Sequence, residues 1–332
     1  MNILVTGCAG FIGFHFCNNL LKKFKKVKIF GIDNFNNYYD VKLKKDRVKL
    51  LKKKFKTRIV ISKIDLLEKK KKKTIFKKKK KKKKNKIKKV VHFAAQAGVR
   101  YSIKNPTKYI QSNIVGFQNI IDLSVKYKVL QLIYASSSSV YGGLKNKKLK
   151  ENLNINDPIQ LYAATKISNE MIANAYFKLY NISIVGLRFF PVYGPWGRPD
   201  MAPMIFTKSI LKKKRIEIFN NGKNYRDFTY IDDIIDGVIK IFKNSENKIF
   251  DNNIYNIGNG RSINVLAFIK ELEKKLKTKT TKNFVPAQPG DMVKTEADIS
   301  KLKKEFNYKP KINFKNGINK FLNWYTKYYQ TK

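Results

Sequence analysis

Short apolar runs recur along the first 188 residues, and stretches with helical spacing of apolar positions lie between several of them. Runs of five to eight residues that are apolar on both faces are typical of parallel strands buried between helices. Helices are predicted from a glycine-rich turn to about residue 24, over 106–127 and over 162–180. Strands are predicted at residues 2–6, 27–33, 58–65, 90–94, 130–136 and 182–188. With right-handed crossovers, this order predicts an α/β fold, a doubly wound parallel Rossmann sheet.

The pattern changes after residue 188. Residues 191–204 are rich in Pro and Gly, and short elements without clean alternation follow them. We expect a smaller lobe here, closing over the carboxyl ends of the strands, where ligands bind in such sheets. The predicted division is a dinucleotide-binding domain at 1–188 and a substrate-binding lobe at 189–332, with some late segments returning to the first domain.

Length and composition bound the class of protein. A chain of 332 residues with 43% hydrophobic residues can bury a sizeable core. No apolar run approaches the ~18 residues of a membrane span, and the strand predicted at 2–6 leaves no room for a cleavable signal. Cys8 and Cys17 are the two cysteines, which indicates a reduced, cytoplasmic setting and no disulfide framework.

The formal net charge is +49 at pH 7, a value that first suggests nucleic acid or an anionic membrane as partner. The excess comes from 64 lysines and eight arginines, whereas proteins that read bases and phosphates favour the bidentate Arg. Lys, Asn, Ile, Phe and Tyr, which A/T-rich codons encode, are all abundant. We therefore interpret the charge as compositional drift and expect no nucleic-acid or membrane partner.

Lysines are densest in residues 69–89, which hold 16 Lys and no acid. Like charges repel along a helix, so this tract predicts a poorly formed surface helix between two strands. Ile75, Phe76 and Ile87 are its candidates for facing a core. A polyanion-binding arm is the alternative, although aromatic residues are not interleaved with the lysines.

A glycine-rich turn joins the first predicted strand to the first helix, with Gly7, Gly10 and Gly13 in the spacing G-x-x-G-x-x-G. Such glycines allow close approach of a pyrophosphate to the backbone, and the helix N-terminus offers free N–H groups. Asp33 ends the second strand, where an acid accepts from ribose hydroxyls and repels a 2′-phosphate. The turn therefore predicts bound NAD rather than NADP.

Several other polar residues have simpler interpretations. Asp65 closes the third strand, where it contacts adenine or caps a helix. Cys8 lies inside the glycine turn and is expected to be a small filler. His15 and His92 fall on an apolar helix and a buried strand, and are expected to be core residues. No group of Cys, His and acidic residues has metal-ligand spacing.

Tyr162 and Lys166 form a Y-x-x-x-K pattern on the helix that follows the fifth strand, so they project to one side together. A Tyr has an ordinary pKa of ~10. A nearby ammonium and a positive nicotinamide ring favour its phenolate, which can take a proton from a sugar hydroxyl. Ser137 ends the fifth strand, where its hydroxyl would lie beside the nicotinamide. Without a general-base His, it is expected to donate or accept hydrogen bonds rather than act as a nucleophile.

Together these residues resemble the extended short-chain dehydrogenases/reductases over nearly the whole chain and, among them, the UDP-glucuronate 4-epimerases. The resemblance is carried by the glycine turn, the Ser–Tyr–Lys set, and the segments 94–102, 188–202, 226–233 and 288–292. It implies that NAD takes hydride from C4 of the sugar while Tyr162 takes the 4-hydroxyl proton. The 4-keto sugar then rotates and is reduced on its other face, so NAD is regenerated.

The resemblance also implies roles for individual residues. Tyr162 is the base, Lys166 holds the nicotinamide ribose, and Ser137 bridges the substrate hydroxyl and Tyr162. UDP would be anchored by Arg226 on phosphate, Asp291 on ribose and Phe219 against uracil. The residues expected to bind cofactor are Gly7, Gly10, Phe11, Ile12, Gly13, Asp33, Asn34, Asp65, Leu66, Ala94 and Lys166.

An acidic sugar needs a partner for its carboxylate. Arg198 is the predicted partner because a guanidinium matches a carboxylate in two bonds. Ser138 and Ser139 could add hydroxyl donors, and Arg100 is a second candidate cation. Pro191 departs from the family pattern, which usually has Thr there, so a hydroxyl expected near the sugar acid is missing.

Other activities on this fold remain as alternatives. A 4-epimerase of UDP-glucose or UDP-GlcNAc would not need Arg198. A nucleotide-sugar 4,6-dehydratase is disfavoured because that family has Asp-Glu where Ser138 and Ser139 stand. A non-catalytic NAD-sensing or polyanion-binding protein would not need the Ser–Tyr–Lys set. The expected partners are a UDP-sugar and a second copy of the chain, packed through the helices at 106–127 and 162–180.

Overall fold

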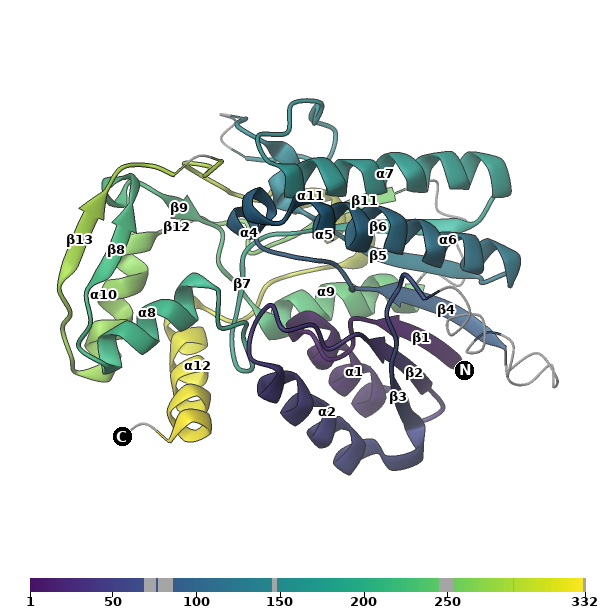
Figure 1. The fold of residues 1–332 in the computed structure, drawn as a ribbon, viewed down its shortest axis with the longest axis horizontal. Helices are drawn as coiled ribbons and strands as arrows, with labels where there is room; N and C mark the ends of the chain where they lie inside the picture. Colours follow the sequence, from purple (N-terminus) through teal and green to yellow (C-terminus); the bar gives the residue numbers. More distant parts are fainter. Residues whose placement is uncertain (69–75, 77–85, 145–147, 245–252, 289, 331–332) are drawn as a thin grey trace.

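The computed structural model describes residues 1–68, 76, 86–144, 148–244, 253–288 and 290–330 (Figure 1). Most of the lysine-rich tract, with Ile75, lies outside the described residues, and so does the helix predicted for it. Phe76 is described and buried, with its ring stacked on Tyr127 at 5.1 Å between centroids. Ile87 is buried as well.

In the described part of the chain, seven parallel strands form the central sheet, in the order β11-β6-β5-β4-β1-β2-β3. The order reverses between β1 and β4, which opens a crevice at their carboxyl ends. This confirms the predicted doubly wound α/β sheet. The strands are β1 (Asn2–Thr6), β2 (Lys28–Asp33), β3 (Ile59–Lys63), β4 (Ile87–His92), β5 (Gln131–Ser137), β6 (Ser183–Phe189) and β11 (Asn253–Ile257).

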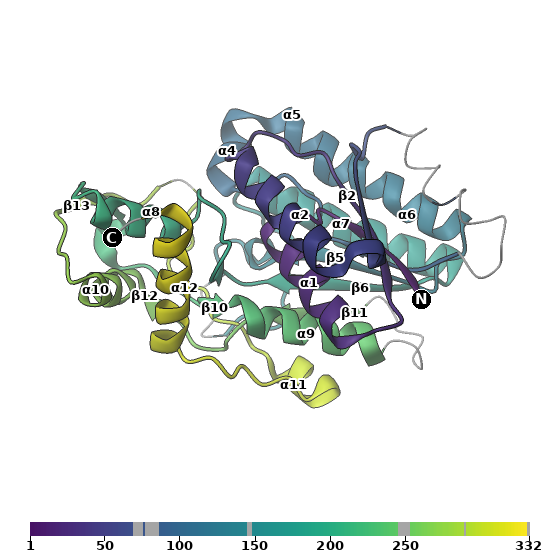
Figure 2. The ribbon, with the colours of Figure 1, turned by 90° about the horizontal axis from the view of Figure 1, so that it is seen from below.

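Helices cover both faces of the sheet (Figures 1 and 2). One face carries α1 (Phe11–Lys23), α2 (Val41–Phe55) and α9 (Ile231–Asn244), whose apolar side chains share one core. The other face carries α5 (Pro106–Tyr109), a π-helical turn η3 (Ile110–Val115), α6 (Gly116–Lys126) and α7 (Leu161–Tyr180). α4 (Val99–Lys104) and α11 (Ser300–Phe306) pack at the margins of these layers.

A smaller lobe stands beyond the carboxyl ends of the strands (Figure 1). Its elements are α8 (Ala202–Leu211), β8 (Ile216–Phe219), α10 (Val265–Leu276), β13 (Lys282–Val285) and α12 (Phe314–Tyr329). Short pairs join lobe and sheet: β7 (Val192–Tyr193) with β10 (Thr229–Tyr230), and β9 (Tyr225–Arg226) with β12 (Ile263–Asn264). The remaining turns are η1 (Lys56–Arg58), η4 (Ser138–Tyr141) and η5 (Asn220–Gly222). Asp227 accepts hydrogen bonds from three backbone N–H groups and Thr229, which fixes the base of the lobe.

The fourth strand corrects the sequence prediction. β4 begins at Ile87 rather than at residue 90, inside the lysine-rich tract. Lys89 is buried, and its Nζ donates to the carbonyl of Phe242 at 2.8 Å while lying over that ring. The long apolar stem of a lysine can pack in a core when its ammonium finds an acceptor. The prediction that Ile75, Phe76 and Ile87 are the residues of the tract that can face a core was therefore wrong for Lys89.

Candidate active site

One cavity of about 1000 Å³ lies between the carboxyl ends of the strands and the small lobe. Its walls come from the glycine turn, the ends of β2 to β6, the start of α7, the 191–202 segment, and β8 and β9 of the lobe. All the residues predicted from the sequence as catalytic, cofactor-binding or substrate-binding line this cavity. Segments far apart in the chain therefore meet at a single site.

The glycine turn is shaped for close approach of a phosphate. Gly7 has φ +67°, and a Cβ on it would lie 2.7 Å from the backbone N of Ala94. A Cβ on Gly13 would lie 2.2 Å from the carbonyl oxygen of Gly7, so α1 packs directly on the turn. α1 begins at Phe11 with Gly10 as N-cap, and its unpaired N–H groups and positive dipole end meet the cavity. These features fit the pyrophosphate of a dinucleotide.

Acidic residues line the cavity beside this turn. Asp33 accepts from the backbone N–H groups of Ala9 at 3.1 Å and Phe35 at 2.9 Å. Burial raises the pKa of its carboxyl, and those two N–H groups and the ammonium of Lys44 oppose the rise. Asp65 accepts from the side-chain amide of Asn34 at 2.9 Å and from the N–H of Leu67 at 2.8 Å. Since each carboxylate oxygen has two lone pairs, both acids can accept further bonds from a nucleotide.

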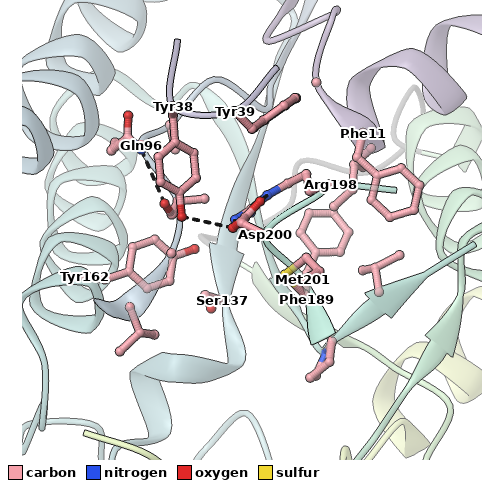
Figure 3. Close-up of a pocket in the computed structure, with 18 of the residues that line it drawn as sticks. Phe11, Tyr38, Tyr39, Gln96, Ser137, Tyr162, Phe189, Arg198, Asp200 and Met201 are labelled. Atoms are coloured by element: carbon pink, nitrogen blue, oxygen red, sulfur yellow. Dashed lines mark hydrogen bonds and ion pairs between the residues drawn. The ribbon is translucent and has the colours of Figure 1, made fainter. Parts of the chain in front are cut away.

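The Ser–Tyr–Lys set assembles where β5 meets α7. Ser137 is the last residue of β5, and Tyr162 and Lys166 lie one turn apart at the start of α7. The Nζ of Lys166 donates to the carbonyl of Ala135 at 2.8 Å. Figure 3 shows Tyr162 and Ser137 facing the same space, with Tyr38, Arg198 and Asp200 on its other side. The geometry suits a proton acceptor held beside a hydroxyl and an ammonium.

Burial dominates the pKa of both members of the Tyr–Lys pair. Burial raises the pKa of Tyr162, and the hydroxyl of Ser137 and the charge of Arg198 lower it. Burial lowers the pKa of Lys166 to about 8, opposed by the charge of Glu170. In the polypeptide alone the pKa of Tyr162 is therefore raised, and its lowering in the presence of bound NAD stays a prediction. The positive nicotinamide ring of bound NAD is the other group predicted to lower the pKa of Tyr162.

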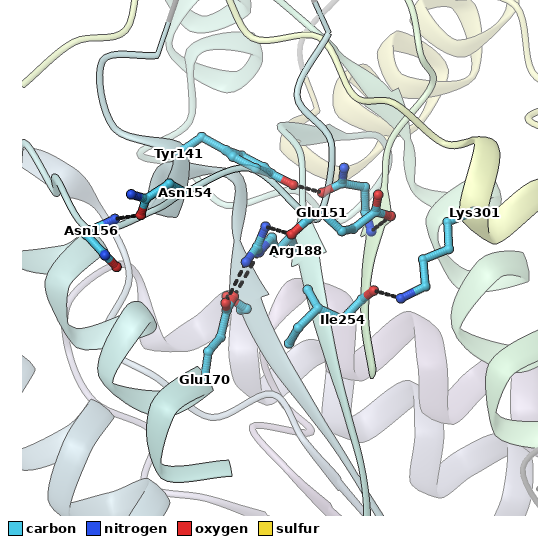
Figure 4. A network of polar contacts seen from close by, with 10 residues as sticks. Tyr141, Glu151, Asn154, Asn156, Glu170, Arg188, Ile254 and Lys301 are labelled. Carbon is cyan, nitrogen blue, oxygen red and sulfur yellow. Dashed lines mark hydrogen bonds and ion pairs between the residues drawn. The ribbon is translucent and has the colours of Figure 1, made fainter. Parts of the chain in front are cut away.

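A buried ion pair packs next to the Ser–Tyr–Lys set. Arg188 donates to Glu170 through Nε at 3.0 Å and Nη2 at 2.7 Å, and Ser136 donates to the same carboxylate at 2.5 Å (Figure 4). Glu170 stands one helical turn beyond Lys166 on α7. The pair therefore ties the end of β5 and β6 to the helix that carries Tyr162. Its signal in the sequence was the spacing of 162, 166 and 170, which places a third polar residue on one helix face.

The π-helical turn η3 anchors α7 from its other side. Asn113 is buried, donates to the hydroxyl of Thr165 at 3.1 Å, and exchanges hydrogen bonds with the backbone of Gln96. Its own carbonyl accepts from the amide of Asn169 at 2.7 Å. These residues carry no signal in the sequence, because a π-turn inside a helical pattern changes its spacing only locally.

At the sugar end, Arg198 pairs with an acid of its own loop. Its Nε donates to Asp200 at 3.1 Å, and its Nη2 donates to the other carboxylate oxygen. Pro191 lines the same cavity, as do Ser138 and Ser139 in η4. Arg198, Ser138 and Ser139 therefore share one cavity with Pro191, which has no hydroxyl where the resemblance predicts a Thr.

The nucleotide end gathers four predicted residues. Arg100 lies over the ring of Phe219 at 4.4 Å and faces Asp291 at 3.9 Å, so it stands with the expected UDP contacts. The Nη1 of Arg226 donates to the carbonyls of Tyr225 and Val293 at 2.9 and 3.1 Å. Burial lowers the pKa of Arg226, and the charge of Asp291 opposes this. A stack of cation and ring beside two charges can hold a base and a diphosphate.

The remaining candidates are structural. His15 bonds to the carbonyl of Pro195 at 2.9 Å and His92 to the hydroxyl of Thr6 at 2.8 Å, both buried as predicted. Cys8 and Cys17 are buried free thiols. Among the described residues, no three His, Cys, Asp or Glu side chains gather as metal ligands. No helix in the described part of the chain is long and apolar enough to cross a membrane.

The Rossmann sheet and the Ser–Tyr–Lys set beside a glycine turn define a short-chain dehydrogenase/reductase of the extended type. Residues 4–321 match the family described as GDP-mannose 4,6 dehydratase, and the chain belongs to this family. The predicted resemblance is thereby confirmed.

Individual relatives cover almost the whole chain. The UDP-glucuronate 4-epimerase 4 of Arabidopsis thaliana is 40% identical over 345 residues, which span 99% of this chain and 76% of the plant protein. The crystal structure of UDP-glucuronic acid 4-epimerase from Bacillus cereus, in complex with UDP-glucuronic acid and NAD, is 35% identical. The match has a TM-score of 0.90 and covers 99% of this chain and 100% of the Bacillus cereus chain. The UDP-glucose 4-epimerase of Thermotoga maritima with UDP-glucose is 27% identical, with a TM-score of 0.86 and coverage of 99% and 100%.

Proposed function

We propose that this protein is an NAD-dependent 4-epimerase that interconverts UDP-glucuronate and UDP-galacturonate. The observation that carries the proposal is a single cavity uniting the glycine turn, the Ser–Tyr–Lys set and the guanidinium of Arg198. The similarity to epimerases named for UDP-glucuronate, at 40% and 35% identity, supports the same assignment.

NAD bound at the glycine turn supplies reversible hydride transfer. Within the polypeptide, Tyr162 takes the proton of the substrate 4-hydroxyl and returns a proton to the same oxygen when the turned 4-keto sugar is reduced on its opposite face. The nearby hydroxyl of Ser137 lowers the pKa of Tyr162 and so favours its phenolate form. Lys166, buried one turn away with a pKa lowered to about 8, supplies positive charge on the same side.

Epimerisation requires the oxidised sugar to turn within the site while the nucleotide stays fixed. Neutral hydroxyls of Ser137, Ser138 and Ser139 line the cavity near Tyr162, and such groups can exchange partners at low cost. At the nucleotide end, Arg100, Phe219 and Arg226 offer cations and a ring that can hold the nucleotide. The distribution suits a loosely held sugar on a firmly held nucleotide.

Two alternatives are weaker. A UDP-glucose 4-epimerase would need no cation beside the sugar, whereas Arg198 lines the cavity with donors that Asp200 does not use; the missing hydroxyl at Pro191 is compatible with a neutral sugar. A 4,6-dehydratase needs an acid and a base beside the carbons that undergo elimination. The residues that follow Ser137 are two serines rather than the acid pair of that reaction.

We also infer a homodimer. Large apolar side chains are exposed on one helical layer: Ile103 on α4, Ile110 and Val115 on η3, and Met171 and Leu179 on α7. Leu179 is 71% exposed, and a second copy of the layer would cover such a face. Sedimentation of wild type and Met171→Glu tests this, because a monomeric wild type would reject the dimer. A cytoplasmic location stays a prediction from cysteine usage.

The activity is tested by incubating the purified protein separately with UDP-glucuronate and UDP-galacturonate, without added reductant, and separating the products by chromatography. Both reactions should reach the same mixture, because an epimerase only approaches equilibrium. Turnover of UDP-glucose without turnover of either acid would reject the proposal in favour of the neutral-sugar epimerase.

A further inference from the structure

Arg198 is held on one edge by a pair of residues outside the Ser–Tyr–Lys set. Asp200 accepts from its Nε and Nη2, and the hydroxyl of Tyr38 donates to the same carboxylate at 2.9 Å (Figure 3). A guanidinium has five N–H donors, so those not used by Asp200 stay available to a ligand. The side chain of Arg198 is 20% exposed and lines the cavity.

Tyr38 has little freedom to turn away. Its ring packs against Tyr101 at 4.7 Å between centroids, and its hydroxyl fits against Gly98. A Cβ on Gly98 would lie 2.2 Å from that hydroxyl oxygen, and Gly98 has φ +99°. The absence of a side chain at residue 98 thus makes room for the Tyr38 hydroxyl to reach Asp200.

The backbone beside Arg198 is fixed independently by Arg47. This residue is fully buried on α2 and donates to the carbonyls of Trp196 and Gly197, and to that of Ala9 in the glycine turn. The loop that carries Arg198 is therefore anchored at the cofactor turn. What remains to be set is the direction of the Arg198 side chain, and the bond from Tyr38 to Asp200 sets it.

We propose that Tyr38 is a positioning residue for recognition of the substrate carboxylate, acting through Asp200 on Arg198. This inference rests on the proposed function, because it assumes that Arg198 binds the carboxylate of UDP-glucuronate. Burial, and to a lesser extent the charge of Asp200, raise the pKa of Tyr38 to about 12. The phenol therefore keeps its proton at neutral pH and can donate a hydrogen bond. The contribution of Tyr38 is one hydrogen bond to a charged pair, and no charge changes when it is lost.

The test is a double-mutant cycle of Tyr38→Phe and Arg198→Ala, with kcat and KM measured for UDP-glucuronate. Tyr38→Phe should raise KM about 5-fold with kcat unchanged, the effect of one hydrogen bond to a charged group acting through a neighbour. In the Arg198→Ala background it should have no further effect on KM. Inhibition by UDP and the amount of bound NAD should stay at wild-type levels in the single variant.

Tyr127→Phe is the matched control, since Tyr127 lies at the end of α6, stacked on Phe76 and outside the cavity. An unchanged KM in Tyr38→Phe, or an equal rise in the Arg198→Ala background, would overturn the positioning role. A wild type that turns over neither UDP-glucuronate nor UDP-galacturonate would instead overturn the proposed function. The two failures are therefore distinguishable.

Discussion

The cofactor end and the sugar end of the cavity are built from different material. At the cofactor end the surface expected to meet the phosphates is backbone: the turn through Gly7, Gly10 and Gly13, and the N-terminus of α1. At the sugar end the cavity surface is formed by side chains, which other side chains position through hydrogen bonds. Tyr38 bonds to a residue 162 positions away, and Arg47 reaches across 149 positions to the carbonyl of Trp196.

This difference determines what each end tolerates. A backbone site has no spare volume, so one added methyl group harms it. A side-chain site has room, so it survives truncation but loses the specificity that the removed polar atom gave. We expect changes at the cofactor end to abolish the holoenzyme, and changes at the sugar end to alter which substrate is bound.

Gly13→Ala should have the largest effect. Its Cβ would lie 2.2 Å from the carbonyl oxygen of Gly7, so the turn must move away from α1. We expect loss of bound NAD and of turnover, with a destabilisation of about 1–3 kcal/mol for an overpacked contact. NAD is measured by absorbance after denaturing the protein. Gly143→Ala is the control, because its nearest contact would be an ordinary 3.9 Å; NAD retained by Gly13→Ala would contradict the backbone account.

Tyr162→Phe should reduce kcat about 10²–10⁴-fold, the usual contribution of a general base, while NAD stays bound. Tyr162 lies between the two ends of the cavity. Its loss should therefore remove the chemical step while the binding surfaces at both ends are retained. The assay is product formation from UDP-glucuronate, with bound NAD measured on the same sample. Activity equal to that of Tyr127→Phe would remove Tyr162 from the mechanism.

Arg198→Ala should raise KM for UDP-glucuronate about 10- to 100-fold, as expected for the loss of charge-assisted hydrogen bonds. Inhibition by UDP, which lacks the sugar acid, should change much less. Arg261→Ala removes an exposed arginine outside the cavity and serves as control. Equal loss of affinity for UDP and UDP-glucuronate would show that Arg198 supports the fold of the site rather than the carboxylate.

His92, the last residue of β4, should contribute a smaller effect, on stability alone. Burial, and then the charge of Lys166, lower the pKa of His92 to about 3, so the folded protein keeps this ring neutral while the unfolded chain protonates it near pH 6.5. Stability from this ring is complete above that pH and declines as the pH falls toward 3. At pH 5 the loss is about 2 kcal/mol.

Urea unfolding of wild type and His92→Asn at pH 7 and pH 5 isolates this contribution. The free-energy difference between the two proteins should shrink by about 2 kcal/mol at the lower pH. A difference that stays constant would mean that His92 is not held neutral.

The contrast between the two ends also explains what the sequence could predict. β1, the glycine turn and α1 are adjacent in the chain, so spacing alone located Gly7 and Gly13. Tyr162 and Lys166 share one helix and were equally accessible. Tyr38 and Asp200 were not, because their pairing depends on tertiary packing that no local period records.

Charge statistics gave partial information. Arg47 is one of eight arginines in a lysine-rich chain, a rarity that could have marked it. Lys89 shows the opposite case. It is a lysine within a tract of 16, so its burial could not be predicted from the sequence, and the structure shows its ammonium donating to the carbonyl of Phe242. Composition thus indicated which charges are unusual, and the fold showed what they contact.

The most direct test of the account is competition between UDP-glucuronate and UDP-glucose in one vessel, with the purified protein and no added reductant. The ratio of their kcat/KM values reports the sugar end alone, because both share UDP and the cofactor chemistry. The account predicts a preference of at least about 10-fold for UDP-glucuronate, which falls toward unity in Arg198→Ala. Equal consumption of the two by the wild type, or a preference for UDP-glucose, would contradict it.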